Sequence, residues 1–150
     1  MTVSADLQKV KISQAVAIQD NMTIFKSIFG TSEKAATYKN NILWNPLTDL
    51  SQLEELVALS KQTPVLIFKH STQCSVSRMA LKQFENGFDV SSKVTPYFLD
   101  LIAYRSISNA IAERFQVTHQ SPQLLLIKNG ESVYDVSHDA IDAEALQLQL

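Results

Sequence analysis

Residues 65–87 read VLIFKHSTQCSVSRMALKQFENG, and this stretch decides the fold. The apolar run Val65–Phe68 predicts a short strand that is buried on both faces. The polar loop KHSTQ follows, and a helix is predicted to begin near Cys74. Gly87 is expected to end that helix, because glycine is common just after the last helical turn. A buried strand that leads through a short loop into a helix is typical of α/β domains.

Strands and helices alternate on both sides of this stretch. In chain order, hydrophobic periodicity predicts an apolar strand-like run at 42–44, a helix over 49–61 capped by Thr48, a strand over 65–68, a helix from Cys74 to Gly87, a strand over 94–101, a helix over 105–115, strands over 124–127 and 132–136, and a helix over 139–147. Asn129-Gly130 predicts an antiparallel hairpin between the last two strands. The other strands are separated by helices, which favours parallel pairing. We therefore predict an α/β protein with a thioredoxin-like fold, in which helices flank a central mixed sheet of four to five strands.

The first 41 residues differ from this regular pattern. They are polar and mixed, with one apolar group at Ile24–Phe29, and we interpret 1–41 as an N-terminal extension and linker that is partly disordered or forms a short helix. The thioredoxin-like domain is predicted to span 42–150. Met22 is a candidate for the natural start, a hypothesis that the intact mass of the natively expressed protein would test.

Composition and charge exclude several classes of protein. The chain has 150 residues, the size of one domain, and its 45% hydrophobic content is enough for a core. A formal net charge of −2 argues against nucleic-acid binding, which needs a basic face. No apolar stretch is long enough for a membrane span. The N-terminus lacks the pattern of a secretory signal, and one cysteine cannot close an internal disulfide, so we expect a reduced, cytoplasmic location.

Cys74 is the candidate nucleophile. It lies just past a buried strand, at the edge of the sheet where open α/β sheets bind ligands, and at the N-terminus of a helix. The unpaired N–H groups and the partial positive charge at that helix end favour thiolate over thiol. The nearby basic side chains Lys69 and His70 are expected to add to this effect. The alternative is a buried structural cysteine, which a lone cysteine often is.

Ser77 limits the mechanism to one thiol. The pattern Val76, Met79, Ala80 and Phe84 predicts the inward face of the helix, so that Cys74 and Ser77 would lie towards its exposed end. Ser77 stands three residues after Cys74, where a dithiol oxidoreductase places its second cysteine. Serine can donate a hydrogen bond to a thiolate but cannot form a disulfide. Any second sulfur must then come from outside the chain.

Pro122 is the second candidate element of the site. Ser121-Pro122 precedes the strand that begins the hairpin, where thioredoxin-like folds hold a cis-proline against the active thiol. The alternative is an ordinary trans proline at a strand start. If Pro122 is a cis-proline beside the thiol, we expect the Ser121 backbone to offer strand-like hydrogen bonds to an incoming peptide or thiol. The three histidines, His70, His119 and His138, have no metal-ligand spacing, and we predict no metal site.

Three segments resemble the monothiol bacilliredoxin family. They read FKHSTQCSVSRMALKQFE, YFLDLIAYRSISNAIAERFQVTHQSPQLLLIKNG and VYDVSHDAI, and the resemblance covers residues 42–150. MTIFKSIFG, from Met22, also resembles a family N-terminus. Family members often carry proline directly after the cysteine, whereas this chain has Ser75. The serine restores an N–H that proline would lack at the start of the helix.

The resemblance implies removal of bacillithiol, a low-molecular-weight thiol, from mixed disulfides on client proteins. Bacillithiol would then be a co-substrate, with no bound cofactor, and Cys74 the attacking thiolate. Two alternatives stay open: a monothiol iron–sulfur carrier of the glutaredoxin type, and a non-catalytic thioredoxin-like binding module. The predicted catalytic residues are Cys74 and Ser77, and the predicted substrate-binding residues are Lys69, His70, Thr72, Ser75, Ser121 and Pro122.

Overall fold

The computed structural model describes residues 42–89 and 92–150. The predictions for residues 1–41, including the linker and the start at Met22, lie outside the described residues, and the domain boundary at 41/42 stays a prediction. The elements are β1 Asn45–Pro46, α3 Gln52–Leu59, β2 Val65–His70, α4 Ser75–Gly87, β3 Thr95–Asp100, α5 Arg105–Phe115, β4 Gln123–Lys128, β5 Glu131–Ser137, the 3₁₀ helix η1 His138–Ala140, and α6 Ala143–Gln147. No helix in these ranges is both long and apolar enough to cross a membrane.

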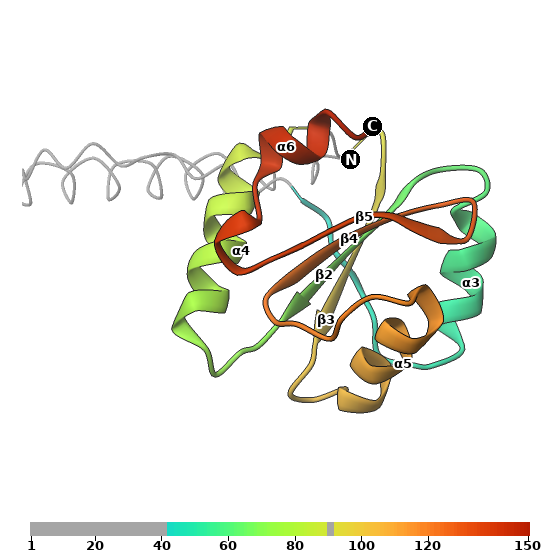
Figure 1. Ribbon diagram of the computed structural model, residues 1–150, viewed down its shortest axis with the longest axis horizontal. Helices are drawn as coiled ribbons and strands as arrows, with labels where there is room; N and C mark the ends of the chain where they lie inside the picture. Colours follow the sequence, from blue (N-terminus) through green and yellow to red (C-terminus); the bar gives the residue numbers. More distant parts are fainter. Residues whose placement is uncertain (1–41, 90–91) are drawn as a thin grey trace, which may run out of the picture. The chain divides into compact units, whose positions relative to one another are not determined.

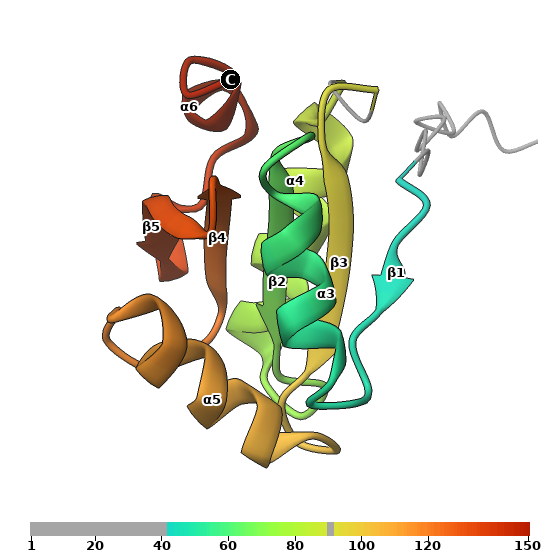
Figure 2. The ribbon, with the colours of Figure 1, turned by 90° about the vertical axis from the view of Figure 1, so that its right-hand side faces the viewer.

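The strands lie between two groups of helices (Figure 1) and form one mixed sheet of five strands in the order β1-β3-β2-β4-β5 (Figure 2). β3 pairs parallel with β1 and β2, whereas β4 pairs antiparallel with β2 and β5. The hairpin between β4 and β5 turns at Asn129 and Gly130, with φ of 54° and 82°. Two successive positive φ angles match the tight turn that the Asn-Gly pair predicts. The predicted fold class, an α/β thioredoxin-like sheet of four to five strands, is confirmed.

Helices cover both faces of the sheet (Figure 2). One core joins α3 and α5 to side chains of β2 such as Val65 and Ile67. The other core joins α4 and α6 to Leu66 and Phe68. Successive side chains of a strand point to opposite faces, so all four of these β2 residues are buried. The same alternation sends the last two side chains of β2 to different sides of the sheet, which positions the candidate site.

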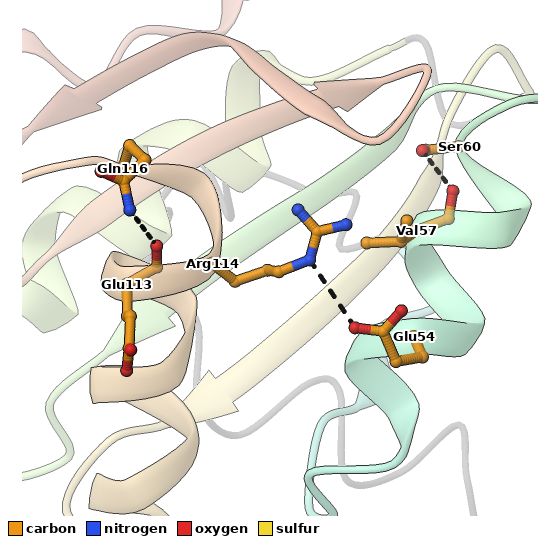
Figure 3. A network of polar contacts seen from close by, with 6 residues as sticks. All are labelled: Glu54, Val57, Ser60, Glu113, Arg114 and Gln116. Carbon is orange, nitrogen blue, oxygen red and sulfur yellow. Dashed lines mark hydrogen bonds and ion pairs between the residues drawn. The ribbon is translucent and has the colours of Figure 1, made fainter.

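An ion pair joins α3 to α5 (Figure 3), and a hydrogen bond joins α3 to the hairpin. Arg114 of α5 lies 3.6 Å from Glu54 of α3, measured from Nε to Oε1. At the end of α3, Ser60 Oγ donates to the Val57 carbonyl at 2.7 Å and accepts from the Gly130 amide at 2.8 Å. The ion pair is exposed and contributes at most about 1 kcal/mol. The buried Ser60 hydroxyl is therefore the stronger link between α3 and the turn of the hairpin.

The strand predicted at 42–44 begins three residues too early, because β1 begins at Asn45. Only Asn45 and Pro46 pair with β3. The Trp44 side chain instead packs against the rings of Phe68 and Phe84, and its Nε1 donates to a carboxylate oxygen of Glu85 at 2.8 Å. Trp44 thus anchors the chain to α4, and pairing begins only after it. Proline is tolerated in β1 because this strand is the edge of the sheet.

The helix predicted over 49–61 begins later, and Thr48 is not its cap. The α3 helix starts at Gln52, whose Oε1 accepts from the backbone amides of Thr48 and Asp49 at 2.8 and 2.9 Å. This side chain holds residues 48–51 in a turn and leaves Leu50 half exposed, whereas Leu53, Leu56 and Val57 of the helix are buried. A glutamine that binds the amides preceding the helix competes with the predicted threonine cap.

The helix predicted over 139–147 is two separate pieces. Residues His138–Ala140 form η1, and α6 begins after Asp142, whose Oδ1 accepts from the Ala145 amide at 2.8 Å. Between the two pieces, Ile141 is extended and buried in the α4–α6 core. Aspartate is a preferred N-cap, so a new helix starts there.

Candidate active site at the carboxyl end of β2

Cys74 occupies the junction between the loop after β2 and the first turn of α4. Its extended backbone makes it the N-cap residue of α4, and its side chain is half buried. The Cys74 amide donates to the Ser71 carbonyl at 3.1 Å, and its carbonyl accepts from the Arg78 amide at 3.1 Å. The thiol is therefore carried on a fixed turn at the positive end of a 13-residue helix.

The Ser121-Pro122 peptide bond is cis, as predicted. β4 begins at the next residue, Gln123, which pairs with Lys69 near the end of β2. The antiparallel pairing places the cis-proline at the same edge of the sheet as the loop that leads to Cys74. The Pro122 carbonyl accepts from the His138 amide at 3.1 Å, which fixes this loop to the start of η1.

The backbone of Ser121 is unpaired in the part of the chain that the structure describes. Among residues 42–89 and 92–150, its amide and carbonyl have no hydrogen-bond partner, and its buried Oγ is unpartnered. An unpaired backbone next to a strand end can pair with an extended segment from another molecule. This arrangement fits the predicted substrate-binding role of Ser121 and Pro122, which stays a prediction.

The predicted inward face of α4 is correct for Phe84 and Ala80, which pack into the core, and wrong for Val76 and Met79. Val76 and Met79 are 52% and 71% exposed, whereas Ser77 is fully buried, together with Phe84 one helical repeat later. The helix is rotated from the orientation that maximal burial of its apolar residues predicts. A polar partner on β2 satisfies the Ser77 hydroxyl, so a small hydroxyl residue takes a core position and the larger Val76 stays at the surface. Ser77 therefore does not lie at the exposed end of the helix beside solvent.

The partner of Ser77 is His70, the last residue of β2. Ser77 Oγ lies 2.8 Å from His70 Nδ1 and accepts from the Ser71 amide at 3.0 Å. Burial lowers the pKa of His70, against the opposing effect of the Asp100 carboxylate. A neutral imidazole leaves Nδ1 free to accept the Ser77 hydroxyl proton. His70 and Ser77 thus join β2 to α4 directly beneath the turn that carries Cys74.

The loop between Ser71 and Cys74 is held on its outer side as well. Thr72 Oγ1 donates to Asp100 Oδ1 at 3.4 Å, and the Thr72 carbonyl accepts from the Arg78 guanidinium at 3.1 Å. Asp100 Oδ1 also accepts from the Ile102 amide at 3.0 Å. Ser75 is exposed at the first position of α4. Thr72 and Ser75 are therefore both accessible beside the thiol.

Lys69 points away from α4, to the opposite face of the sheet, and is fully buried. Its Nζ donates to Gln123 Oε1 at 2.8 Å. Gln123 Nε2 donates to the Thr118 carbonyl at 2.9 Å, which ties the loop before the cis-proline to the sheet. Burial, aided by the nearby Arg105, lowers the pKa of Lys69 to about 8. The structure thus separates Lys69 from His70, although the sequence groups them.

Sequence reasoning missed Gln123. The only signal was a glutamine directly after the predicted cis-proline, at the start of the apolar run Leu124–Ile127. In the structure this side chain is completely buried, its Oε1 accepts from Lys69 and its Nε2 donates to the Thr118 carbonyl. A buried glutamine needs polar partners, and those partners come from segments 54 and 5 residues away in the chain.

Removing the Ser77 hydroxyl is expected to destabilise the protein. Ser77→Ala leaves His70 Nδ1 and the Ser71 amide without a buried partner, and each loss of this kind costs about 1–3 kcal/mol. Urea unfolding followed by circular dichroism measures the change. Ser75→Ala is the matched control, because this exposed serine lies two residues earlier on the same helix. Its effect should stay below about 0.5 kcal/mol. Equal effects of the two substitutions would contradict a structural role for the Ser77–His70 contact.

Comparison with known proteins identifies the family. Residues 45–146 match the family model described as monothiol bacilliredoxin BrxC. The chain belongs to the monothiol bacilliredoxin family. A solved structure described as an oxidoreductase with a thioredoxin fold is 31% identical, covers 69% of this chain and 89% of its own, and has a TM-score of 0.60. The thioredoxins of Malassezia sympodialis and Fasciola hepatica are 20% and 19% identical, over 71% and 70% of this chain and 86% and 94% of theirs, each with a TM-score of 0.54.

Family membership and geometry together define the chemistry. The chain is a thiol–disulfide oxidoreductase, and Cys74 is its only cysteine. Among residues 42–89 and 92–150, no three His, Cys, Asp or Glu side chains gather as a group that could hold a metal ion. Cys74 lies at the start of α4, at the same end of the sheet as the cis-proline, and its role as the nucleophile stays a prediction.

Proposed function

We propose that the protein removes bacillithiol from mixed disulfides on client proteins through Cys74. The observation that carries this proposal is one accessible thiol at the N-cap of α4, at the edge shared with a cis-proline, in a chain of the monothiol bacilliredoxin family. Bacillithiol is the thiol co-substrate. The proposal includes a cytoplasmic location, because an unpaired thiol persists in a reducing compartment.

The exchange takes place in two steps. The Cys74 thiolate attacks the bacillithiol sulfur of the mixed disulfide, and the sulfur–sulfur bond to the client breaks. The client leaves as a thiolate, which takes a proton from solvent, and Cys74 now carries bacillithiol as a disulfide. A second thiol, from solution or from a reductase, then attacks the bacillithiol sulfur. That step forms a new disulfide and releases the Cys74 thiolate, so no second cysteine of this chain is needed.

The surrounding residues have distinct proposed roles. The first turn of α4 stabilises the thiolate with its unpaired amides, among them that of Ser75. Ser121 pairs through its free amide and carbonyl with the backbone or amide groups of the incoming disulfide, and Pro122 fixes its position. Thr72 lines the exposed side of the thiol. Ser77 and His70 do not contact the substrate. Their hydrogen bonds hold the turn that carries Cys74 against the end of β2.

Mass spectrometry of the Cys74 adduct tests the proposal. The full chain is incubated with one client protein that carries either bacillithiol or glutathione on the same cysteine. We expect Cys74 to acquire the bacillithiol mass faster than the glutathione mass. One client thiol should be released for each adduct that forms on Cys74. An adduct of client protein on Cys74 would show attack at the wrong sulfur, and an absence of both adducts would overturn the proposal. A coloured protein after anaerobic reconstitution with iron and sulfide would instead support the iron–sulfur carrier.

A further inference from the structure

A group of three basic side chains lies beside the cis-proline loop, on the face of the sheet opposite α4. We call it the basic cluster, and it consists of Lys69, Arg105 and His119. Hydrogen bonds link Lys69 and His119 to neighbouring segments, and Arg105 lies close to both of them in the fold. Lys69 binds Gln123, and Gln123 binds the carbonyl of the residue preceding His119. His119 Nε2 in turn lies 2.9 Å from the hydroxyl of Ser108, one turn after Arg105 on α5.

The basic cluster lacks a negative partner. Among the residues that the structure describes, neither Lys69 nor Arg105 forms an ion pair. The Lys69 ammonium is completely buried against a neutral amide, with one of its three donors used. Lysine is rarely fully buried unless it is paired, because an isolated charge is costly away from water.

The members of the basic cluster also repel one another. After burial, the positive charges of Lys69 and Arg105 are the next causes that lower the pKa of His119. Arg105 acts in the same direction on Lys69. The acidic residue at this edge, Asp100, is engaged by Thr72 and the Ile102 amide. The field of the cluster is therefore not neutralised from within, and it extends to the surface at Arg105, which is exposed.

We propose that the basic cluster binds a carboxylate of the low-molecular-weight thiol while its sulfur is at Cys74. Arg105 makes the direct contact, since guanidinium groups bind carboxylates with two parallel hydrogen bonds. Lys69 supplies charge from beneath without contact, and His119 bounds the site beside the cis-proline loop. This inference rests on the proposed function, because it assumes that Cys74 exchanges disulfides with a small thiol.

Position in the fold supports a subsite of the same reaction. Lys69 is the residue before His70 at the end of β2, and Arg105 begins α5, five residues after the end of β3. β2 and β3 are parallel and end at the same edge, with His70 opposite Asp100. The basic cluster and Cys74 therefore flank one edge of the sheet, on either side of β2. A small ligand with a thiol at one end and a carboxylate at the other would bridge them.

Two small disulfides that differ in charge test this inference. Dithiodipropionate carries a carboxylate at each end, and bis(2-hydroxyethyl) disulfide carries none. The rate at which the full reduced chain forms the Cys74 adduct is measured for both by intact mass. We expect Arg105→Gln to slow the reaction with dithiodipropionate about twofold to fivefold, as for loss of one exposed charge pair, and to leave the rate with the neutral disulfide unchanged. In the original protein, high salt should slow the reaction with dithiodipropionate and leave the reaction with the neutral disulfide unchanged.

Arg114→Gln is the matched control. This arginine is exposed on the same helix, and its ion pair with Glu54 lies at the other end of α5. It should leave both rates unchanged. Equal slowing of both disulfides by Arg105→Gln, or no slowing of either, would overturn the inference. Slowing only of a disulfide within an acidic peptide would also overturn it, in favour of a protein partner. Failure of Cys74 to react with either disulfide would instead reject the proposed function.

Discussion

Replacing Cys74 by serine is expected to lower the rate of thiol–disulfide exchange by at least about a thousandfold. The thiolate is the nucleophile in such exchange, and a serine hydroxyl does not ionise near neutral pH. Because the chain has no other cysteine, no second thiol can substitute. The release of client thiol from a mixed disulfide gives the rate. Near-ultraviolet and far-ultraviolet circular dichroism should be unchanged, since Cys74 is half buried and oxygen replaces sulfur with little change of shape.

The control for this substitution is Ser132→Ala. Ser132 lies on β5 beside the hairpin turn, at the edge of the sheet opposite the site, and its hydroxyl makes one long contact of 3.4 Å. The rate of thiol–disulfide exchange by the Ser132→Ala variant should stay within about twofold of that of the original protein, as for most substitutions remote from a site. Retention of more than a tenth of the activity by a folded Cys74→Ser variant would show that the thiol is not the nucleophile.

Replacing Lys69 by methionine is expected to stabilise the protein while impairing the reaction. Burial lowers the pKa of Lys69 from 10.5 to about 8, which corresponds to about 3 kcal/mol at neutral pH. Methionine keeps the unbranched apolar stem without the charge. Gln123 Oε1 loses a donor, at a cost of about 1 kcal/mol, but keeps a long contact with the Gln120 amide. The free energy of unfolding, measured in urea at pH 7, should therefore rise by about 1–3 kcal/mol.

The pH dependence has a defined sign. Because the pKa of Lys69 is lower in the folded chain, the unfolded chain binds the proton more tightly. Below about pH 8 both states are protonated, and the full penalty destabilises the folded state. As the pH rises from about 8 towards 10.5, the folded state loses its proton first, and stability increases. The advantage of Lys69→Met over the original chain should therefore shrink between pH 8 and 9.5.

Lys61→Met is the control for this experiment. Lys61 is exposed after α3, so its replacement should change the free energy of unfolding by less than about 0.5 kcal/mol at every pH. If Lys69→Met were less stable than the original chain at pH 7, the buried ammonium would have a stabilising partner, and the unbalanced basic cluster would be wrong. A gain in stability together with slower reaction of carboxylate-bearing disulfides is the pattern expected for a charge retained for function.

The orientation of α4 could not be predicted from its own sequence pattern. Hydropathy places Val76 and Met79 inside, yet the helix buries Ser77, because a serine can satisfy His70 Nδ1 and the Ser71 amide at once. No local pattern reveals that two polar groups will meet across a gap of seven residues and two elements. The same limit hid Gln123, whose partners become neighbours only when β2 and β4 pair.

The order of strands and helices, the Asn-Gly turn and the placement of Cys74 after a buried strand could all be predicted from the sequence alone. These features follow from short-range causes: alternation of apolar residues, turn preferences and the end of a strand run. Only the tertiary structure decided which way each polar side chain of the site points. The direction of a buried polar side chain depends on the partners that packing brings to it. For Lys69 the partner is Gln123 of β4, and His70 of β2 and Ser77 of α4 are partners of each other.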